Sequence, residues 1–98
     1  MRLLITNGVE QGRVLRLRPG LNRIGRSVEN HFQVPDPSIS SGHCEVIYSD
    51  VGVVVRDLNS TNGTYINGRR IAYGESRLIE DGDVVGFGDV EVRLRKSE

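Results

Sequence analysis

Several residue types are nearly absent from this 98-residue sequence, which has one cysteine, one alanine, one lysine and no tryptophan. The single cysteine, Cys44, excludes an internal disulfide framework and a zinc site built from clustered cysteines, and it fits a reducing compartment. No apolar run approaches the roughly 18–20 residues that a membrane-spanning helix needs. The apolar start is too short for a secretory signal. We therefore expect a cytoplasmic protein with no membrane partner.

The sequence also lacks an excess of either charge, because 13 basic residues balance 13 acidic ones. Zero net charge disfavours a protein built mainly to hold nucleic acid. Residues 1–26 are nevertheless basic, with six arginines and one glutamate. A small nucleic-acid-binding β-barrel therefore stays as an alternative. Two phenylalanines and no tryptophan offer little for base stacking, so we expect no nucleic-acid partner.

The residues that are abundant favour strands. There are 13 valines and seven isoleucines, and the twelve glycines indicate many turns. Short apolar segments separated by turn residues predict about ten strands in an all-β sandwich or barrel. These segments are 3–6, 13–18, 21–24, 32–34, 43–48, 53–58, 64–66, 69–71, 84–87 and 90–94, and Leu78-Ile79 leads to the turn at 80–83.

Two segments carry more specific predictions. The run Val53-Val54-Val55 indicates a strand that is buried on both faces. Asn67-Gly68, between two short strands, is the strongest two-residue sequence pattern for a hairpin turn.

No reaction is indicated by the sequence. It contains neither a phosphate-binding G-x-x-x-x-G-K-[ST] loop nor a G-x-S-x-G nucleophile elbow. His43 and Cys44 are adjacent in an expected strand, so their side chains point to opposite faces and cannot easily form a nucleophile–base pair. We expect Cys44 in the core, no enzyme activity, no metal and no cofactor.

Polar residues concentrate instead in three stretches at loops or strand ends: Gly25–Ser27, Ser38–His43 and Asn59–Thr64. They supply hydroxyls, amides, glycines and one guanidinium, and they include no strong nucleophile or base. Such groups donate hydrogen bonds, which suits the binding of a phosphate better than the breaking of a bond.

These stretches resemble those of the forkhead-associated (FHA) domain, a phosphothreonine-peptide binding module. The matching pieces are Gly25-Arg26, Ser40-x-x-His43, the segment 57–68 and the segment 78–88. Their order and spacing are specific, although each short piece alone is weak. The resemblance covers essentially the whole chain, so we expect one FHA-like domain over residues 1–98. It implies an eleven-stranded β-sandwich of two mainly antiparallel sheets, with ligand loops at one end.

The resemblance also implies roles for individual residues. Arg26 would contact the phosphate, and Ser40 would donate its hydroxyl to the same oxygens. Ser41 would contact phosphate or peptide through side chain or backbone. Thr61 would help shape the phosphothreonine pocket, and Asn62 would hydrogen-bond the ligand's main chain. The family often has Arg, Lys or Asn at the position of Ser41, so its effect on phosphate affinity stays open.

Four further residues are expected to support this site structurally. Gly25 would allow a close approach before the phosphate-binding arginine, and His43 would brace the loops through hydrogen bonds. Gly63 and Asn67 would shape the turns nearby.

The expected function is therefore that of an adaptor in Ser/Thr kinase signalling, with a phosphothreonine-containing protein as its partner: the kinase itself or one of its substrates. The alternative is a phosphate-independent interaction or self-association scaffold on the same fold. That alternative is motivated by Ser41 and by the exposed-looking Arg69, Arg70 and Tyr73. The identity of the partner, its sequence preference and the extent of the full protein stay open.

Overall fold

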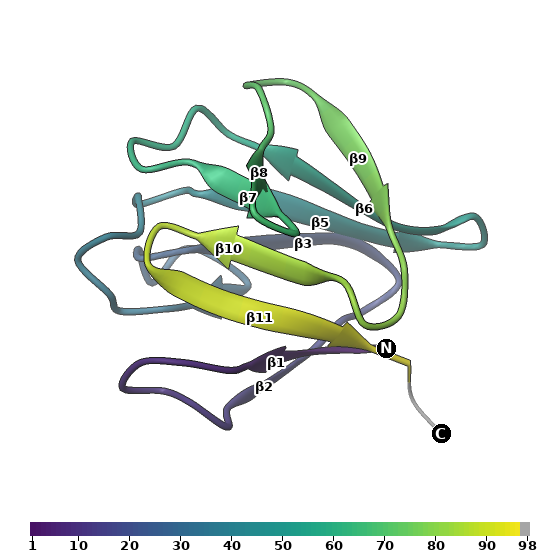
Figure 1. Ribbon diagram of the computed structural model, residues 1–98, viewed down its shortest axis with the longest axis horizontal. Coiled ribbons are helices and arrows are strands. Elements are labelled where there is room, and N and C mark those ends of the chain that lie inside the picture. The colour runs from purple at the N-terminus through teal and green to yellow at the C-terminus, as the bar shows by residue number, and fades with distance from the viewer. Residues whose placement is uncertain (97–98) are drawn as a thin grey trace.

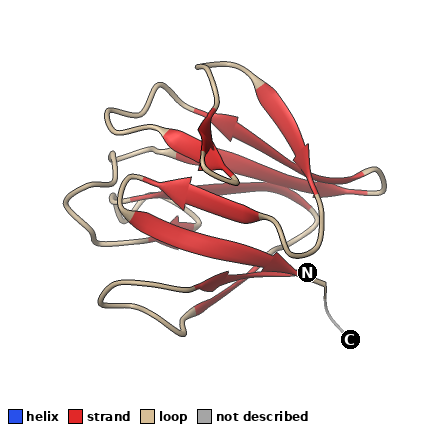
Figure 2. Cartoon of the chain, in the orientation of Figure 1, coloured by secondary structure: helices blue, strands red, loops and turns tan. Residues whose placement is uncertain are grey.

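The structure, a computed structural model, describes residues 1–96 as two packed β-sheets (Figure 1). The first sheet has the strand order β2-β1-β11-β10-β7-β8 and the second has the order β4-β3-β5-β6-β9. All strand pairs are antiparallel except β3 with β4. Within residues 1–96 there is no helix (Figure 2). The expected eleven-stranded, mainly antiparallel sandwich is thus confirmed.

The strands lie close to the segments expected from the sequence. Their bounds are β1 Arg2–Ile5, β2 Val14–Arg16, β3 Gly20–Gly25, β4 Phe32–Gln33, β5 Cys44–Ser49, β6 Gly52–Asp57, β7 Thr64–Ile66, β8 Arg69–Arg70, β9 Ser76–Ile79, β10 Val84–Phe87 and β11 Val90–Arg95.

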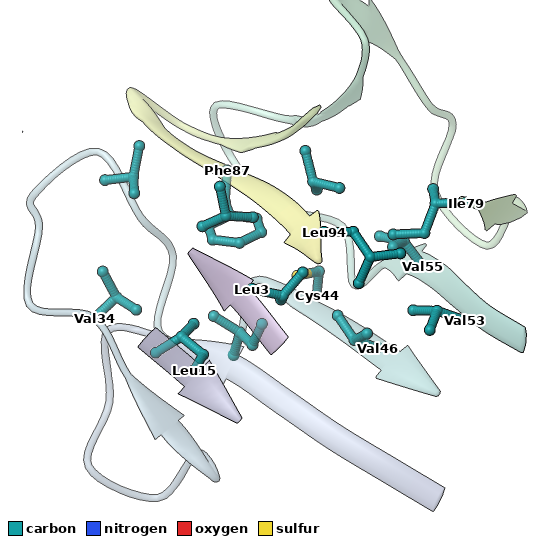
Figure 3. Packing of buried hydrophobic residues seen from close by; sticks show 14 of the residues in the cluster. Leu3, Leu15, Val34, Cys44, Val46, Val53, Val55, Ile79, Phe87 and Leu94 are labelled. Atoms are coloured by element: carbon teal, nitrogen blue, oxygen red, sulfur yellow. The ribbon is translucent and has the colours of Figure 1, made fainter. Parts of the chain in front are cut away.

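The core fills the space between the two sheets with aliphatic side chains from both (Figure 3). Alternate residues of each strand point inward, for example Leu3 and Ile5 of β1. Cys44 is fully buried among them, as expected. Full burial of an aliphatic side chain contributes about 1.5–3 kcal/mol, so this layer is the main source of stability.

One expectation about burial is wrong. Val53 and Val55 are buried in the core, but Val54 is only half-buried and lies on the outer face of its sheet. The strand is therefore buried on one face, as is usual in a sandwich of antiparallel sheets. A continuous apolar run had suggested burial on both faces.

The connections that carry the three polar stretches gather at one end of the sandwich. The β3–β4, β4–β5, β6–β7 and β10–β11 connections lie at the left of Figure 1, and both chain termini lie at the right. The β1–β2 loop lies at the same left end. No described segment forms a helix that is long and apolar enough to cross a membrane.

Candidate functional site

The β3–β4 and β4–β5 loops are joined by backbone hydrogen bonds at the end of β3. The N–H of Arg26 donates to the carbonyl of Ser40 at 2.9 Å, and the N–H of Ser27 donates to the carbonyl of Ser41 at 3.1 Å. The guanidinium Nε of Arg26 donates to the Ile39 carbonyl at 2.9 Å. Within residues 1–96, its two terminal amino groups make no hydrogen bond to protein. An exposed side chain is thus held at its base while four N–H donors remain available.

The β6–β7 loop meets the β4–β5 loop beside this arginine. The N–H of Thr61 donates to Ser40 Oγ at 3.0 Å, and Asn62 Nδ2 donates to the Ser38 carbonyl at 2.9 Å. Within residues 1–96, Ser40 Oγ accepts this bond and donates none, so its proton is free to donate to a ligand. Thr61 and Asn62 are exposed at the tip of the loop. The structure therefore brings Arg26, Ser40, Thr61 and Asn62 together, with Ser41 exposed next along the chain.

His43 is buried beneath these loops and bridges two of them. Its Nδ1 accepts the N–H of Ser40 at 3.1 Å, and its Nε2 lies 2.8 Å from the Gly63 carbonyl. A carbonyl can only accept, so Nε2 carries the proton and the imidazole is neutral. Burial lowers the pKa of His43, although the Gly63 hydrogen bond and the nearby Asp57 carboxylate act in the opposite direction. Both ring nitrogens are occupied by backbone groups, so His43 supports the site.

A buried cluster around Asp57, which the sequence analysis did not predict, fixes the base of the β6–β7 loop. The carboxylate accepts hydrogen bonds from the hydroxyls of Ser60 and Thr64 and from the backbone N–H of Ser60. Ser60 Oγ in turn accepts a hydrogen bond from the backbone N–H of Gly63. Burial opposes ionisation of the carboxyl, but the hydrogen bonds from Ser60 and Thr64 hold the pKa of Asp57 below its ordinary value. The pattern Asp-x-x-Ser at a strand end could have indicated this side-chain-capped turn.

Two glycines permit the close contacts between loops. A Cβ on Gly25 would lie 2.7 Å from Asn30 Nδ2 and closer still to the Ser41 carbonyl oxygen. That oxygen also accepts a hydrogen bond from Asn30 Nδ2, another contact that the sequence did not predict. Gly63 has a φ of +93°, and a Cβ there would lie 2.7 Å from Arg70 Nε. Both positions therefore exclude a side chain.

Asn67 lies away from the site. It has a φ of 50° in the β7–β8 turn, and its side chain bonds the carboxylate of Asp83 and the N–H of Val84. These contacts are at the opposite end of β7 from the β6–β7 loop. The expected hairpin turn is present, but Asn67 does not contact the site loops, because a three-residue strand separates it from them.

The site residues offer hydrogen-bond donors and, at Arg26, a permanent positive charge. Among the described residues, no group of three or more His, Cys, Asp or Glu side chains could hold a metal ion. The Cys44 thiol is fully buried, and burial raises its pKa far above the ordinary value, so it is not a nucleophile. This arrangement suits the binding of an anion without chemical change.

Comparison with known families gives one match that covers both the strands and the polar loops. The model of the FHA domain family matches residues 22–88, which include the three polar loops, most of β3 and all of strands β4 to β10. This chain belongs to the FHA domain family. Its strands β1, β2 and β11, which lie outside that match, complete the six-stranded sheet. An FHA domain is a binding module and not a catalytic domain.

Individual relatives agree with this assignment. The chain is 37% identical over 84 residues to the FHA domain-containing protein FhaA of Mycobacterium tuberculosis, covering 86% of this chain but 15% of FhaA. An FHA structure from a study of phosphothreonine-dependent FHA domain interactions is 34% identical, with a TM-score of 0.87 and coverage of 99% of this chain and 96% of that one. The FhaA FHA domain, solved in complex with the intracellular domain of Rv3910, is 35% identical, with a TM-score of 0.84 and coverage of 96% and 98%.

Proposed function

We propose that this FHA domain binds phosphothreonine peptides at the junction of its β3–β4, β4–β5 and β6–β7 loops and acts as an adaptor in Ser/Thr kinase signalling. FHA domains bind phosphothreonine peptides, and one of the similar structures comes from a study of such interactions. The observation that carries the assignment of the site is the exposed Arg26 guanidinium with free N–H donors beside the free hydroxyl proton of Ser40.

The chemistry of a phosphothreonine matches these donors. The phosphate carries about −1.5 to −2 charges at pH 7 and three strong acceptor oxygens. A planar, permanently charged guanidinium can bond two of those oxygens at once, which an ammonium cannot. In our proposal Arg26 and Ser40 bind the phosphate, and Ser41 contacts the phosphate or the peptide.

The β6–β7 loop supplies the remaining ligand contacts. Thr61 shapes the pocket around the phosphothreonine. Asn62 is anchored through Nδ2 to the Ser38 carbonyl and still has its Oδ1 and one N–H, so it can pair with the peptide's main chain. Gly25, His43 and Gly63 hold these groups in place without touching the ligand.

We further propose that the chain has no catalytic activity of its own and that residues 1–98 act as one binding domain in a reducing, cytoplasmic compartment. Support comes from the groups present: the one thiol is buried and protonated, and both nitrogens of the buried histidine bond backbone groups. The partner in this proposal is a Ser/Thr kinase or one of its substrates, whose phosphothreonine the domain recognises. The chain spans 15% of the length of FhaA, so the role of any larger protein rests on this proposal as well.

Titration by fluorescence anisotropy tests the proposal. A library of phosphothreonine peptides is compared with the same peptides bearing threonine and phosphoserine. We expect binding of phosphothreonine peptides only. Equal binding of phosphorylated and unphosphorylated peptides would favour the alternative, a phosphate-independent scaffold.

A further inference from the structure

The outer face of the five-stranded sheet carries an apolar row that crosses four strands. Leu21 of β3 lies opposite Ile47 of β5, Ile47 lies opposite Val54 of β6, and Val54 lies opposite Leu78 of β9. Directly opposite residues of neighbouring strands point to the same face. The sequence neighbours Asn22, Val46, Val53, Val55 and Ile79 are buried on the inner face, so the row lies on the outer one.

This row departs from the polar pattern of the rest of the outer face. Leu21 is 43% exposed and Leu78 is 57% exposed, while Ile47 and Val54 are partly exposed. Single exposed apolar residues are common, but a continuous row across a sheet is typical of a surface that another molecule covers. In a sheet with one solvated face, polar residues are expected at these positions.

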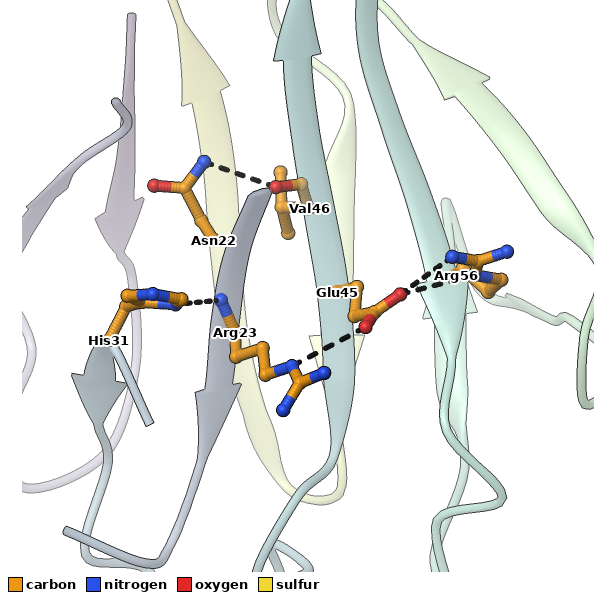
Figure 4. A network of polar contacts seen from close by, with 6 residues as sticks. All are labelled: Asn22, Arg23, His31, Glu45, Val46 and Arg56. Atoms are coloured by element: carbon orange, nitrogen blue, oxygen red, sulfur yellow. Dashed lines mark hydrogen bonds and ion pairs between the residues drawn. The ribbon is translucent and has the colours of Figure 1, made fainter. Parts of the chain in front are cut away.

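The apolar row is bordered on the loop side by fixed charges. Glu45 has a mostly buried side chain, and its carboxylate forms two ion pairs (Figure 4). One carboxylate oxygen lies 2.8 Å from a terminal nitrogen of Arg56, and the other lies 3.5 Å from Nε of Arg23. Two guanidinium groups share one carboxylate, so this border carries a net positive charge. The ion pairs direct both arginine side chains toward Glu45, and 56% of the Arg23 side chain and 41% of the Arg56 side chain stay exposed on this face.

The border on the opposite side of the apolar row has a glycine and an acidic residue. Gly52 precedes Val53 and Glu80 follows Ile79, and Val53 and Ile79 are paired, so Gly52 and Glu80 lie at the same end of the β6–β9 pair. Glu80 is exposed, and within residues 1–96 its carboxylate takes part in no ion pair. Gly52 has no side chain of its own, and a methyl group of Leu78 reaches toward it. An arginine from another molecule would therefore meet the edge of the apolar row and the opposite charge of Glu80 there.

We propose that this face binds a second copy of the chain, with the two apolar rows packed against each other about a two-fold axis that runs along the rows. This axis keeps each strand over its counterpart and reverses the direction of the strands. Arg56 of one copy then lies over Gly52 and Glu80 of the other, and the same pair recurs by symmetry. Zero net charge adds no long-range repulsion.

The size of the face predicts a weak dimer. Neighbouring strands are about 4.8 Å apart, so a row of four residues is about 14 Å long. Such a contact buries less than the roughly 1,200 Å² that is typical of stable complexes. The dimer forms without phosphopeptide and places the two Arg26 loops at opposite ends. It would therefore bind a partner with two phosphothreonines more tightly than a partner with one.

Sedimentation velocity tests this proposal, with the chain alone at concentrations from about 10 μM to about 1 mM. We expect the average sedimentation coefficient to rise with concentration. Leu78→Lys should weaken the association by about tenfold or more, because it places a charge in the apolar row. Val14→Lys is the matched control, since Val14 is an exposed apolar residue on an edge strand of the other sheet. It should leave the association unchanged.

Two further variants separate the proposal from peptide binding and from other geometries. Glu80→Lys should weaken the dimer, and an unchanged dimer would contradict the proposed axis. Arg26→Ala should dimerise like the parent chain even if it binds no peptide. A parent chain that stays monomeric throughout, or equal effects of Leu78→Lys and Val14→Lys, would overturn the proposal.

Discussion

The binding end of the domain has two layers that differ in how fully their hydrogen-bonding groups are used. The outer layer, formed by Arg26, Ser40, Ser41, Thr61 and Asn62, is exposed or half-buried and keeps free donors. The inner layer is buried, and each of its polar side chains is bonded.

The inner layer consists of His43, Asp57, Ser60 and Thr64. No buried side-chain nitrogen or oxygen in the described residues lacks a partner. Ring contact between His43 and Phe87, with centroids 6.0 Å apart, joins this layer to the core. The comparison supports our proposal that the outer layer binds the ligand, with the inner layer holding the loops in position.

The largest expected effect is the loss of binding in Arg26→Ala. Truncating one partner of a charge pair costs about 2–5 kcal/mol, so affinity for a phosphothreonine peptide should fall by at least about thirtyfold. Thermal unfolding should change little, because the side chain is exposed. Isothermal titration calorimetry and thermal denaturation measure the two quantities. Arg18→Ala, at an exposed arginine outside the site, is the control and should retain affinity.

Asp57→Asn should lower the stability of the fold, in contrast to Arg26→Ala. The variant loses a buried negative charge that accepts three hydrogen bonds, which we expect to lower the free energy of unfolding by about 3 kcal/mol. For a domain of this size the melting temperature should fall by more than about 10 °C. Scanning calorimetry measures this change. Unaltered stability would show that the inner layer is not a structural support.

Ser40→Ala removes a proposed contact to the ligand and also a contact between two loops. The variant loses a donor to the phosphate, worth about 1.5–3 kcal/mol for a hydrogen bond to a charged group. It also removes the acceptor for the Thr61 N–H, which costs stability of about 1 kcal/mol or less at this exposed position. We expect affinity to fall by about tenfold or more while the fold persists. Anisotropy titration of Ser40→Ala and Arg26→Ala with the same phosphopeptide compares the two losses of affinity. A larger loss in Ser40→Ala than in Arg26→Ala would contradict the expected order.

The smallest expected effect is a pH dependence of stability from His43. Its pKa in the folded state is lowered, so the unfolded chain binds a proton that the folded chain does not as pH falls below about 6.5. Stability from this group is present above that pH and declines as pH falls toward the folded pKa, by at most about 1.4 kcal/mol per pH unit.

Melting temperatures between about pH 5 and 7.5 isolate the histidine, since carboxyl groups titrate mainly below this range. His43→Gln should flatten the slope. Equal slopes in the parent chain and in His43→Gln would contradict the expectation.

Much of the fold could be predicted from the sequence, because strand alternation and turn residues are local properties. Asn67-Gly68 indicated the turn between β7 and β8 correctly. Val54 was harder to place, since an apolar residue within an apolar run does not reveal which face it occupies. Only the pairing with Ile47 and Leu78 shows that it lies outside.

The site could be predicted only in part. The residues of the outer layer are named by the resemblance to FHA domains, and the structure brings them together. The role of Asp57 depends on bonds to Ser60 and Thr64 across a turn, and that of Asn30 depends on a contact with another loop. Such contacts follow from the folded arrangement, and sequence spacing alone does not specify them.

The most direct test of the binding site is a chemical-shift titration of the isotope-labelled domain with one phosphothreonine peptide and its threonine counterpart. We expect the phosphopeptide to shift the amides of Arg26, Ser40, Ser41, Thr61 and Asn62 together with the Arg26 Nε–H resonance. The unphosphorylated peptide should leave them unmoved. Shifts confined to another part of the surface, or equal shifts with both peptides, would contradict this account.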